Sequence, residues 1–208
     1  MALDLEEQEQ VDELKALWKK YGNYITRGAI AFFVLYGLFQ GWGYYQNKQS
    51  LSASEAYQGI VVLDEKNTKE IIEKSQRLID DYSGTPYAGR AAILFAKASY
   101  AEGAKDKAKE KLEWASGHAK ESATESIALI QLGQILLEEK KYEEALKKAN
   151  AVDNEGYLGL SNDLKGDVLN AMGKKEDAKK AYLEALKRFG PKDAYARFTQ
   201  EKLESLGV

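Results

Sequence analysis

The sequence predicts an all-α protein, with an N-terminal transmembrane helix followed by a tetratricopeptide-repeat-like α-solenoid. Three observations carry this prediction. The run 28–43 contains no charged residue, a pattern of small and large apolar residues recurs every 33–37 residues after it, and no segment of any length alternates with the period of a strand.

Composition excludes the commonest kinds of enzyme. The 208 residues include no cysteine and one histidine, so thiol catalysis, disulfides, and metal sites built from cysteines or several histidines are ruled out. The formal net charge is −3, with lysine and arginine spread along the chain, which gives no electrostatic footprint for nucleic acid. We therefore expect a non-enzymatic protein without cofactor, metal or nucleic-acid partner.

The first expected elements are an acidic N-terminal segment, residues 1–23, with a helix from about Glu6 to Tyr21, and a transmembrane helix at 24–45. Seven large apolar residues between Ile30 and Phe39 contribute about −2 to −4 kcal/mol to insertion, and tyrosine and tryptophan flank both ends. A buried core helix is the alternative. A cleaved signal peptide fits less well, because such peptides begin with a short basic region.

The distribution of positive charge predicts the orientation of this helix. Lys15, Lys19 and Lys20 precede it, Arg27 lies at its start, and fewer lysines follow it closely. Lysine and arginine collect on the cytoplasmic side of membrane helices. We expect a cytoplasmic N-terminus and a repeat domain, residues 46–208, on the far side.

The repeats align on a small residue in the first helix of each copy: Gly59, Ala96, Gly133 and Gly166, which lie 37, 37 and 33 residues apart. This spacing is close to the 34 residues of tetratricopeptide repeats, in which small residues let paired helices approach. Gly103 and Gly173 follow two of these helices, where a left-handed backbone is useful. The expected repeats cover 52–83, 86–118, 121–152 and 157–190. A closing helix is expected at 192–206, with a face of Tyr195, Phe198 and Leu203 that caps the stack.

No catalytic motif is found. Gly41-Trp42-Gly43 begins like a dinucleotide-binding loop but lacks a third glycine, and His118 reads as an ordinary surface residue near a helix end. Within the expected membrane helix, Gly37 and Gly41 form a small-xxx-small pair that would let a partner helix pack closely, with Gln40 as a polar contact. Chance glycines explain this pair equally well.

The concave face of a tetratricopeptide solenoid is lined by the first helix of each hairpin, at the positions six and three residues before the anchor and one and four after it. This rule predicts a groove that is apolar in the middle and acidic at its far end, suited to a peptide or helix with a hydrophobic stretch and a basic end. An equally weighted alternative is that its isoleucines and leucine only pack beneath neighbouring repeats. The candidate groove residues are Ile93, Lys97, Tyr100, Ile127, Ile130, Gln134, Leu137, Asp163 and Asp167.

The chain resembles the YfgM-like family, the ancillary subunits of the bacterial Sec translocon. The resemblance is carried by Glu9-Gln10-Val11-Asp12, by Gly41-Trp42-Gly43-Tyr44, by Ser52-Ala53-Ser54-Glu55-Ala56-Tyr57, and most specifically by Glu155-Gly156-Tyr157 with Asp163-Leu164-Lys165-Gly166-Asp167. It implies a single-pass inner-membrane protein with a periplasmic repeat domain. The alternative is a tetratricopeptide adaptor for a different cell-envelope assembly.

The resemblance also implies the partners. They are Sec translocon subunits, a membrane-anchored periplasmic chaperone of the prolyl-isomerase type, exported polypeptides and inner-membrane lipid. The implied role is that of a scaffold that links exported proteins to periplasmic chaperones.

Overall fold

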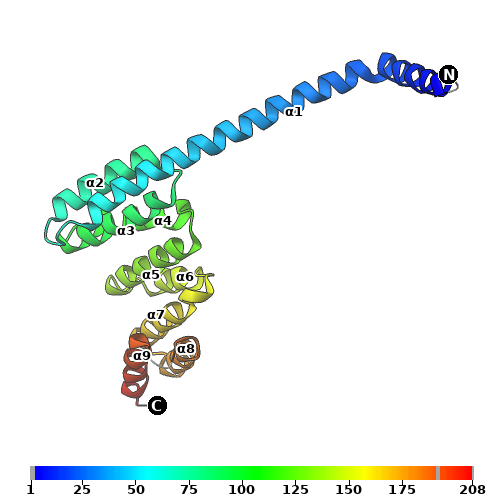
Figure 1. The fold of residues 1–208 in the computed structure, drawn as a ribbon. Helices are drawn as coiled ribbons and strands as arrows, with labels where there is room; N and C mark the ends of the chain where they lie inside the picture. The colour runs from blue at the N-terminus through cyan, green and yellow to red at the C-terminus, as the bar shows by residue number, and fades with distance from the viewer. Residues whose placement is uncertain (1–2, 191–192, 208) are drawn as a thin grey trace. The chain divides into compact units, whose positions relative to one another are not determined.

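The structure, a computed structural model, describes residues 3–190 and 193–207. The chain divides into two compact units between Lys48 and Gln49. Apart from one short 3₁₀ helix, all the regular structure in the described ranges is α-helical (Figure 1). The all-α solenoid of the second unit is therefore as the sequence predicts.

The described part of the first unit is a single helix, α1, which runs without a break for 59 residues from Leu3 to Val61 and so continues into the second unit. The sequence predicted three separate helices here, the last beginning near residue 52. They merge because neither of the two prolines lies in this region, and the serines at 50, 52 and 54 are tolerated in a helix. The last turns of α1 belong to the second unit, where Ile60 is buried.

The prediction of a transmembrane helix at 24–45 is wrong. Among the described residues, no helix combines the length and the apolar character that crossing a membrane requires. The apolar run is diluted by Arg27 at its start, by Gln40, and by tyrosines and glycines that lower its mean hydropathy. The predicted single-pass topology, which depends on this helix, is therefore also wrong.

The second unit is a row of helical hairpins in which each helix from α2 onward packs against the next. The short η1 opens the last hairpin, and α3, α5 and α7 also contact one another in turn, as first helices of successive repeats do. The helices after α1 are α2 (Thr68–Tyr82), α3 (Pro86–Ala101), α4 (Lys105–His118), α5 (Ser122–Glu138), α6 (Tyr142–Asn150), η1 (Glu155–Tyr157), α7 (Leu158–Ala171), α8 (Lys175–Arg188) and α9 (Ala194–Ser205).

The core of this unit runs through the hairpins and combines buried leucines and isoleucines, the largest number of them on α5, with many alanines. Leu78, Leu112, Leu132 and Leu164 are almost fully buried. Buried alanines accompany them on α3, α4, α5 and α6, so paired helices approach closely. A smaller second cluster joins α8 to the end of α9.

The closing helix differs from its prediction in the face that it buries. The predicted start at residue 192 lies outside the described residues, and α9 begins at Ala194, where Asp193 accepts a capping hydrogen bond from the backbone N–H of Tyr195. Of the three residues expected to cap the stack, Tyr195 and Phe198 are 55% and 51% exposed, whereas Leu203 is half-buried against the cluster of α8 and α9. Thr199 and Leu206 are buried instead, because they lie on the side that faces the last hairpin.

Candidate protein-binding groove

The candidate groove residues lie on three first helices of successive hairpins. The candidates on α3 are Ile93, Lys97 and Tyr100. Those on α5 are Ile127, Ile130, Gln134 and Leu137, and those on α7 are Asp163 and Asp167. The structure brings one subset together around a pocket, buries a second subset in the core, and pairs the third with α9.

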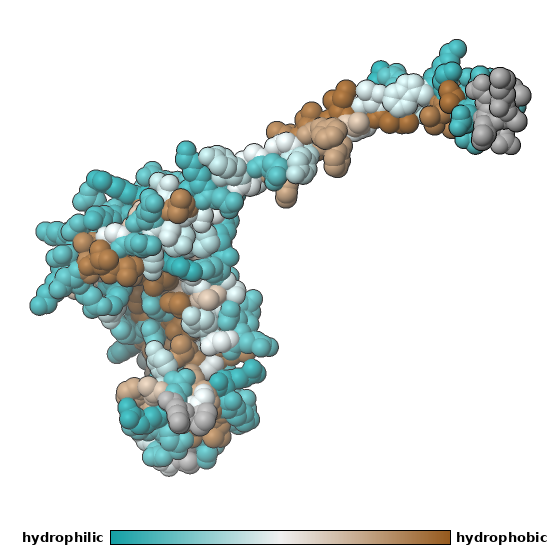
Figure 2. Space-filling model, in the orientation of Figure 1, coloured by the Kyte–Doolittle hydropathy of each residue, from teal (hydrophilic) through white to brown (hydrophobic). Residues whose placement is uncertain are grey.

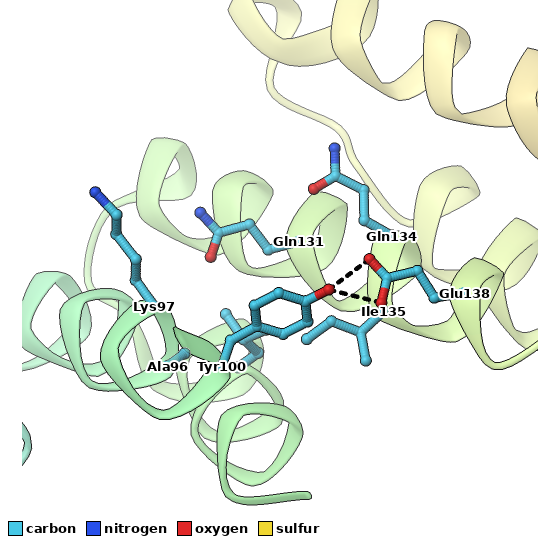
Figure 3. A pocket seen from close by; sticks show the side chains of 8 residues that line it. Ala96, Lys97, Tyr100, Gln131, Gln134, Ile135 and Glu138 are labelled. Atoms are coloured by element: carbon cyan, nitrogen blue, oxygen red, sulfur yellow. Dashed lines mark hydrogen bonds between the residues drawn. The ribbon is translucent and has the colours of Figure 1, made fainter. Parts of the chain in front are cut away.

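The pocket, with a volume of about 300 Å³, lies between α3 and α5 (Figure 3). Three of the candidate groove residues line it, Lys97 and Tyr100 from α3 and Gln134 from α5. Ala96, Leu112 and Ile135 add apolar surface, and Gln131 and Glu138 were missed. Gln131 stands three residues before Gln134 on the same helix face, so i, i+3 spacing was the available signal.

The Tyr100 side chain crosses the pocket from α3 to α5. Its hydroxyl donates to the Glu138 carboxylate, 2.7 Å from both oxygens, as Figure 3 shows. Lys105 at the start of α4 pairs with the same carboxylate at 2.7 Å, and its ammonium lies 5.3 Å from the centre of the Tyr100 ring. This triad connects two repeats at the groove surface.

The triad shifts the protonation equilibria of its members. The hydrogen bonds from Lys105 and then Tyr100 lower the pKa of Glu138 below its ordinary value. The hydrogen bond to Glu138 raises the pKa of both Tyr100 and Lys105. At neutral pH the carboxylate is therefore charged and already compensated, which leaves this part of the groove nearly neutral.

Two side-chain amides on the α5 wall keep their hydrogen-bonding capacity. Within the described ranges, neither Gln131 nor Gln134 makes a side-chain hydrogen bond, and Gln134 is exposed. In Figure 3 both amides lie on the same side of the pocket as Lys97. Each amide offers two N–H donors and a carbonyl acceptor to a molecule that enters.

A second pocket of about 300 Å³ adjoins the first and shares Lys97 with it. It lies between α3 and the helix ends around residues 57–71, and its walls are mostly apolar, including Tyr57, Leu63 and Leu94. The Lys97 ammonium pairs with the Glu65 carboxylate at 2.6 Å. Lys97 therefore separates two apolar hollows along one face.

Most of the apolar candidates lie in or against the core. Ile130 is only 7% exposed, and Ile93 and Leu137 pack against the main core cluster while remaining partly accessible. Ile127 is half-buried. A substitution at Ile130 therefore reports on stability before it reports on binding.

The acidic end is occupied by the chain itself. Lys202 of α9 pairs with Asp163 and Asp167, each at 2.7 Å. Thr199 donates to Asp163 at 2.7 Å, and the Tyr182 hydroxyl donates to Asp167 at 2.8 Å. The two carboxylates hold the closing helix in this structure.

Burial dominates the electrostatics of this end. Burial raises the pKa of Asp167 despite its hydrogen bond with Lys202, and burial beside Asp167 raises the pKa of Tyr182 far above its ordinary value. The two carboxylates raise the pKa of Lys202 against its own burial. Lys202 was missed because a lysine in the closing helix gives no sequence signal for a contact 35–39 residues away.

The three predicted helix-packing residues lie on α1. At Gly37 and Gly41, apart from the adjoining residues and the backbone of the helix itself, no heavy atom lies within 4 Å of the position where a Cβ would stand. Gln40 donates from its side-chain amide to the Tyr36 hydroxyl at 3.2 Å, one turn earlier.

Comparison with known proteins agrees with this architecture. Residues 15–208 match the family model described as a tetratricopeptide repeat-like domain. A protein of Neisseria gonorrhoeae named ancillary SecYEG translocon subunit is 30% identical over 99% of this chain and 100% of its own length. Proteins of the same name from Aggregatibacter actinomycetemcomitans and Escherichia coli are 28% and 23% identical, over 91% and 97% of this chain and 93% and 97% of their own.

Proposed function

Because the chain belongs to the YfgM-like family with a tetratricopeptide repeat-like domain, we propose that it is a non-enzymatic scaffold associated with the Sec translocon. Relatives that carry the name of ancillary SecYEG translocon subunit match it nearly end to end, which supports the association. In this role the repeat domain holds a polypeptide partner near the translocon.

The observation that carries the docking role is the pocket between α3 and α5. Its floor of Ala96, Leu112 and Ile135 accepts an apolar side chain, and the free amides of Gln131 and Gln134 stand beside it. An extended polypeptide presents one N–H and one carbonyl per residue, which such amides can bind without reading a particular sequence. The groove therefore suits an uncharged, extended segment.

The polypeptide partners that fit this groove are of two kinds. Exported chains are extended and expose apolar residues before they fold, as the pocket requires. A chaperone of the prolyl-isomerase type is the second partner, docked through a segment of its own, so that the scaffold links exported proteins to a folding factor.

The open backbone of α1 at Gly37 and Gly41 is a proposed second contact, with a helix of a partner. Two helices can approach each other closely where their facing residues are glycines or other small residues. Replacing both glycines with isoleucine would then weaken co-purification of the partner. Unchanged co-purification at equal expression would exclude this contact.

Co-purification of the full chain in mild detergent tests the association. Translocon subunits are expected to accompany the tagged protein. Recovery of a different cell-envelope assembly in their place would support the adaptor alternative and overturn the translocon assignment.

A double substitution, Gln131→Ala with Gln134→Ala, tests the groove. It removes the free amides without touching a fully buried residue, so helicity should be unchanged while binding of an extended, uncharged model peptide weakens. Gln200→Ala, on an exposed face of α9, is the matched control. Wild-type peptide affinity in the double variant would place the docking site elsewhere.

A further inference from the structure

We propose that the two apolar hollows beside α3 bind one extended segment of a partner polypeptide through two apolar side chains three residues apart. That the occupant is a polypeptide is taken from the proposed function, on which this proposal rests. The spacing of the two side chains, the backbone conformation and a charge preference follow from the positions of the hollows and of Lys97.

The hollows lie on opposite sides of α3. With 3.6 residues per turn, Ala96 and Tyr100 lie about 60–100° to one side of Lys97, where they line the hollow toward α5. Ala98 and Ala101 lie about 40–100° to the other side, where they line the hollow toward the end of α1. Lys97 lines both, so its side chain forms the ridge between an α5-side hollow and an α1-side hollow.

The α1-side hollow continues into exposed apolar surface. Val61, which lines the hollow, and Val62 after it are 56% and 80% exposed. Figure 2 shows apolar residues gathered on the second unit near this end of α1. Each hollow has a volume of about 300 Å³, at the lower end of the range for small-molecule sites, so each suits one apolar side chain.

The distance between the hollows selects the conformation of the segment. They lie in the grooves on either side of one helix, and packed helices are about 8–10 Å apart, so the hollows are separated by about one such spacing. In polyproline II, residues three apart lie on one side of the chain, about 9 Å from each other. Residues on one side of a β-strand are about 7 or 13 Å apart, and neither distance fits as well.

The polar groups around the hollows favour an extended backbone over a helix. A helix with apolar residues seven apart would also span about 10 Å, but its carbonyls are already bonded within it. Polyproline II leaves every carbonyl and N–H free. Among the described residues Glu65 takes one N–H of the Lys97 ammonium, so two donors remain on the ridge, and Gln131 and Gln134 stand beside it on the α5 wall (Figure 3).

Lys97 also sets a charge preference. Its side chain is 62% exposed and that of Glu65 is 82% exposed, so their ion pair is a surface pair that contributes little. An acidic residue of the partner can therefore take the place of Glu65, whereas a basic residue would be repelled by Lys97. The partner segment accordingly has apolar residues at both ends of a four-residue motif and no basic residue between them.

Peptide binding to the full chain tests the spacing. Acetylated, amidated peptides of proline and glutamine carry two leucines two, three or four residues apart, a helical alanine-rich peptide carries them seven apart, and a reference peptide carries one leucine. By fluorescence anisotropy, a spacing of three is expected to bind about tenfold more tightly than the reference, because a second side chain is partly buried.

The outcomes separate this proposal from the groove itself. Tightest binding at any other spacing would overturn the proposal. Equal binding of all the peptides would also overturn it, while leaving the groove as a docking site. Binding of none of them would overturn both.

Filling one hollow tests whether two sites act together. Ala101→Phe places a ring in the α1-side hollow from an exposed position at the end of α3, so the second leucine should lose its tenfold effect. Ala171→Phe, at the corresponding exposed position at the end of α7, is the matched control and should bind as the wild type does. Circular dichroism checks that both variants remain helical. An unchanged effect of the second leucine in Ala101→Phe would refute the two-hollow site.

The charge preference is tested with peptides that carry glutamate or lysine between leucines three apart. The wild type is expected to bind the glutamate peptide several-fold more tightly, and Lys97→Met should bind the two alike. A preference that persists in Lys97→Met would contradict the position of the segment over this ridge.

Discussion

Lys140 has a left-handed backbone conformation with a φ of 59°. In the second and fourth repeats the corresponding residues are Gly103 and Gly173, with φ of 80° and 77°. The chain closes each turn identically, since the next residue donates its N–H to the carbonyl five residues earlier: Ala104 to Ser99, Lys141 to Leu136, and Lys174 to Leu169.

We therefore expect Lys140→Gly to stabilise the protein by about 0.5–1 kcal/mol, because it relieves the strain of a side chain in this conformation. The reverse change, Gly173→Lys, should destabilise it by about as much. Urea unfolding of both variants measures the effect. A loss of stability in Lys140→Gly would show that flexibility of the unfolded chain outweighs the strain.

Glu139, beside this turn, couples stability to acid. Hydrogen bonds from Lys109 and then Lys141 lower its pKa to about 2. A folded-state pKa below the unfolded value gives stability that is complete above about 4.5 and is lost as pH falls toward 2. Lys109→Met should therefore cost stability at pH 7 and much less at pH 2.

The matched control for this experiment is Lys107→Met, an exposed lysine on the same helix. It should leave the pH dependence of unfolding unchanged. If Lys109→Met lowers the free energy of unfolding equally at pH 7 and pH 2, the effect comes from lost packing of the lysine stem rather than from Glu139.

Single residues divide into those that the sequence could predict and those that it could not. The turn glycines were recognised because a left-handed position leaves a strong local preference, and the structure confirms them. The strain at Lys140 was not recognised, since a lysine carries no such mark. Glu138 was missed as a partner of Tyr100 because their contact depends on how two hairpins stack.

At the scale of helices, two paired helices can pack closely where one of them has a glycine opposite a large side chain of the other. A Cβ at Gly166 would overlap the ring of Tyr182 on α8. That ring cannot shift freely, because its hydroxyl is bonded to Asp167. By contrast, Gly59 in α1 has open space around it.

Gly166→Ala is expected to destabilise the protein by about 1–3 kcal/mol through overpacking. Gly59→Ala, the matched control, should be neutral or stabilising by up to about 1 kcal/mol, because alanine favours a helix. Thermal unfolding separates the two. Equal effects would mean that the α7–α8 pair adjusts without cost.

The sequence predicts a helix well where local signals set its ends. It predicts poorly which face of a helix is buried when packing against other helices sets that face. The prediction for α1 failed in two ways: no residue breaks the helix between its expected parts, and its apolar run is too diluted to cross a membrane. The buried face of α9 was misjudged because its aromatic residues suggested packing. The contacts are made by Thr199, Lys202 and Leu206.

At the scale of the second unit, each helix is stabilised mainly by its contacts with the helices next to it in the row. Each helix from α2 to α8 contacts the next α-helix along the chain, and the main core cluster reaches α7, while α8 and α9 share a separate small cluster. In such a row, damage at one end weakens the adjacent helices first. The acidic groove end was predicted as a ligand site because the sequence does not show that the last helix folds back on it.

Lys202→Met should therefore loosen the C-terminal end alone. It leaves Asp163 and Asp167 without their cation in a site that already raises the pKa of Asp167 by burial. Because Lys202 is partly exposed, we expect a loss of about 1–3 kcal/mol, so amides of α8 and α9 exchange roughly 10–100-fold faster while those of α3–α5 are unchanged. Lys180→Met, which removes an exposed pair with Asp177, is the control and should change neither region. Faster exchange throughout α2–α9 would instead show that the solenoid opens as one cooperative body.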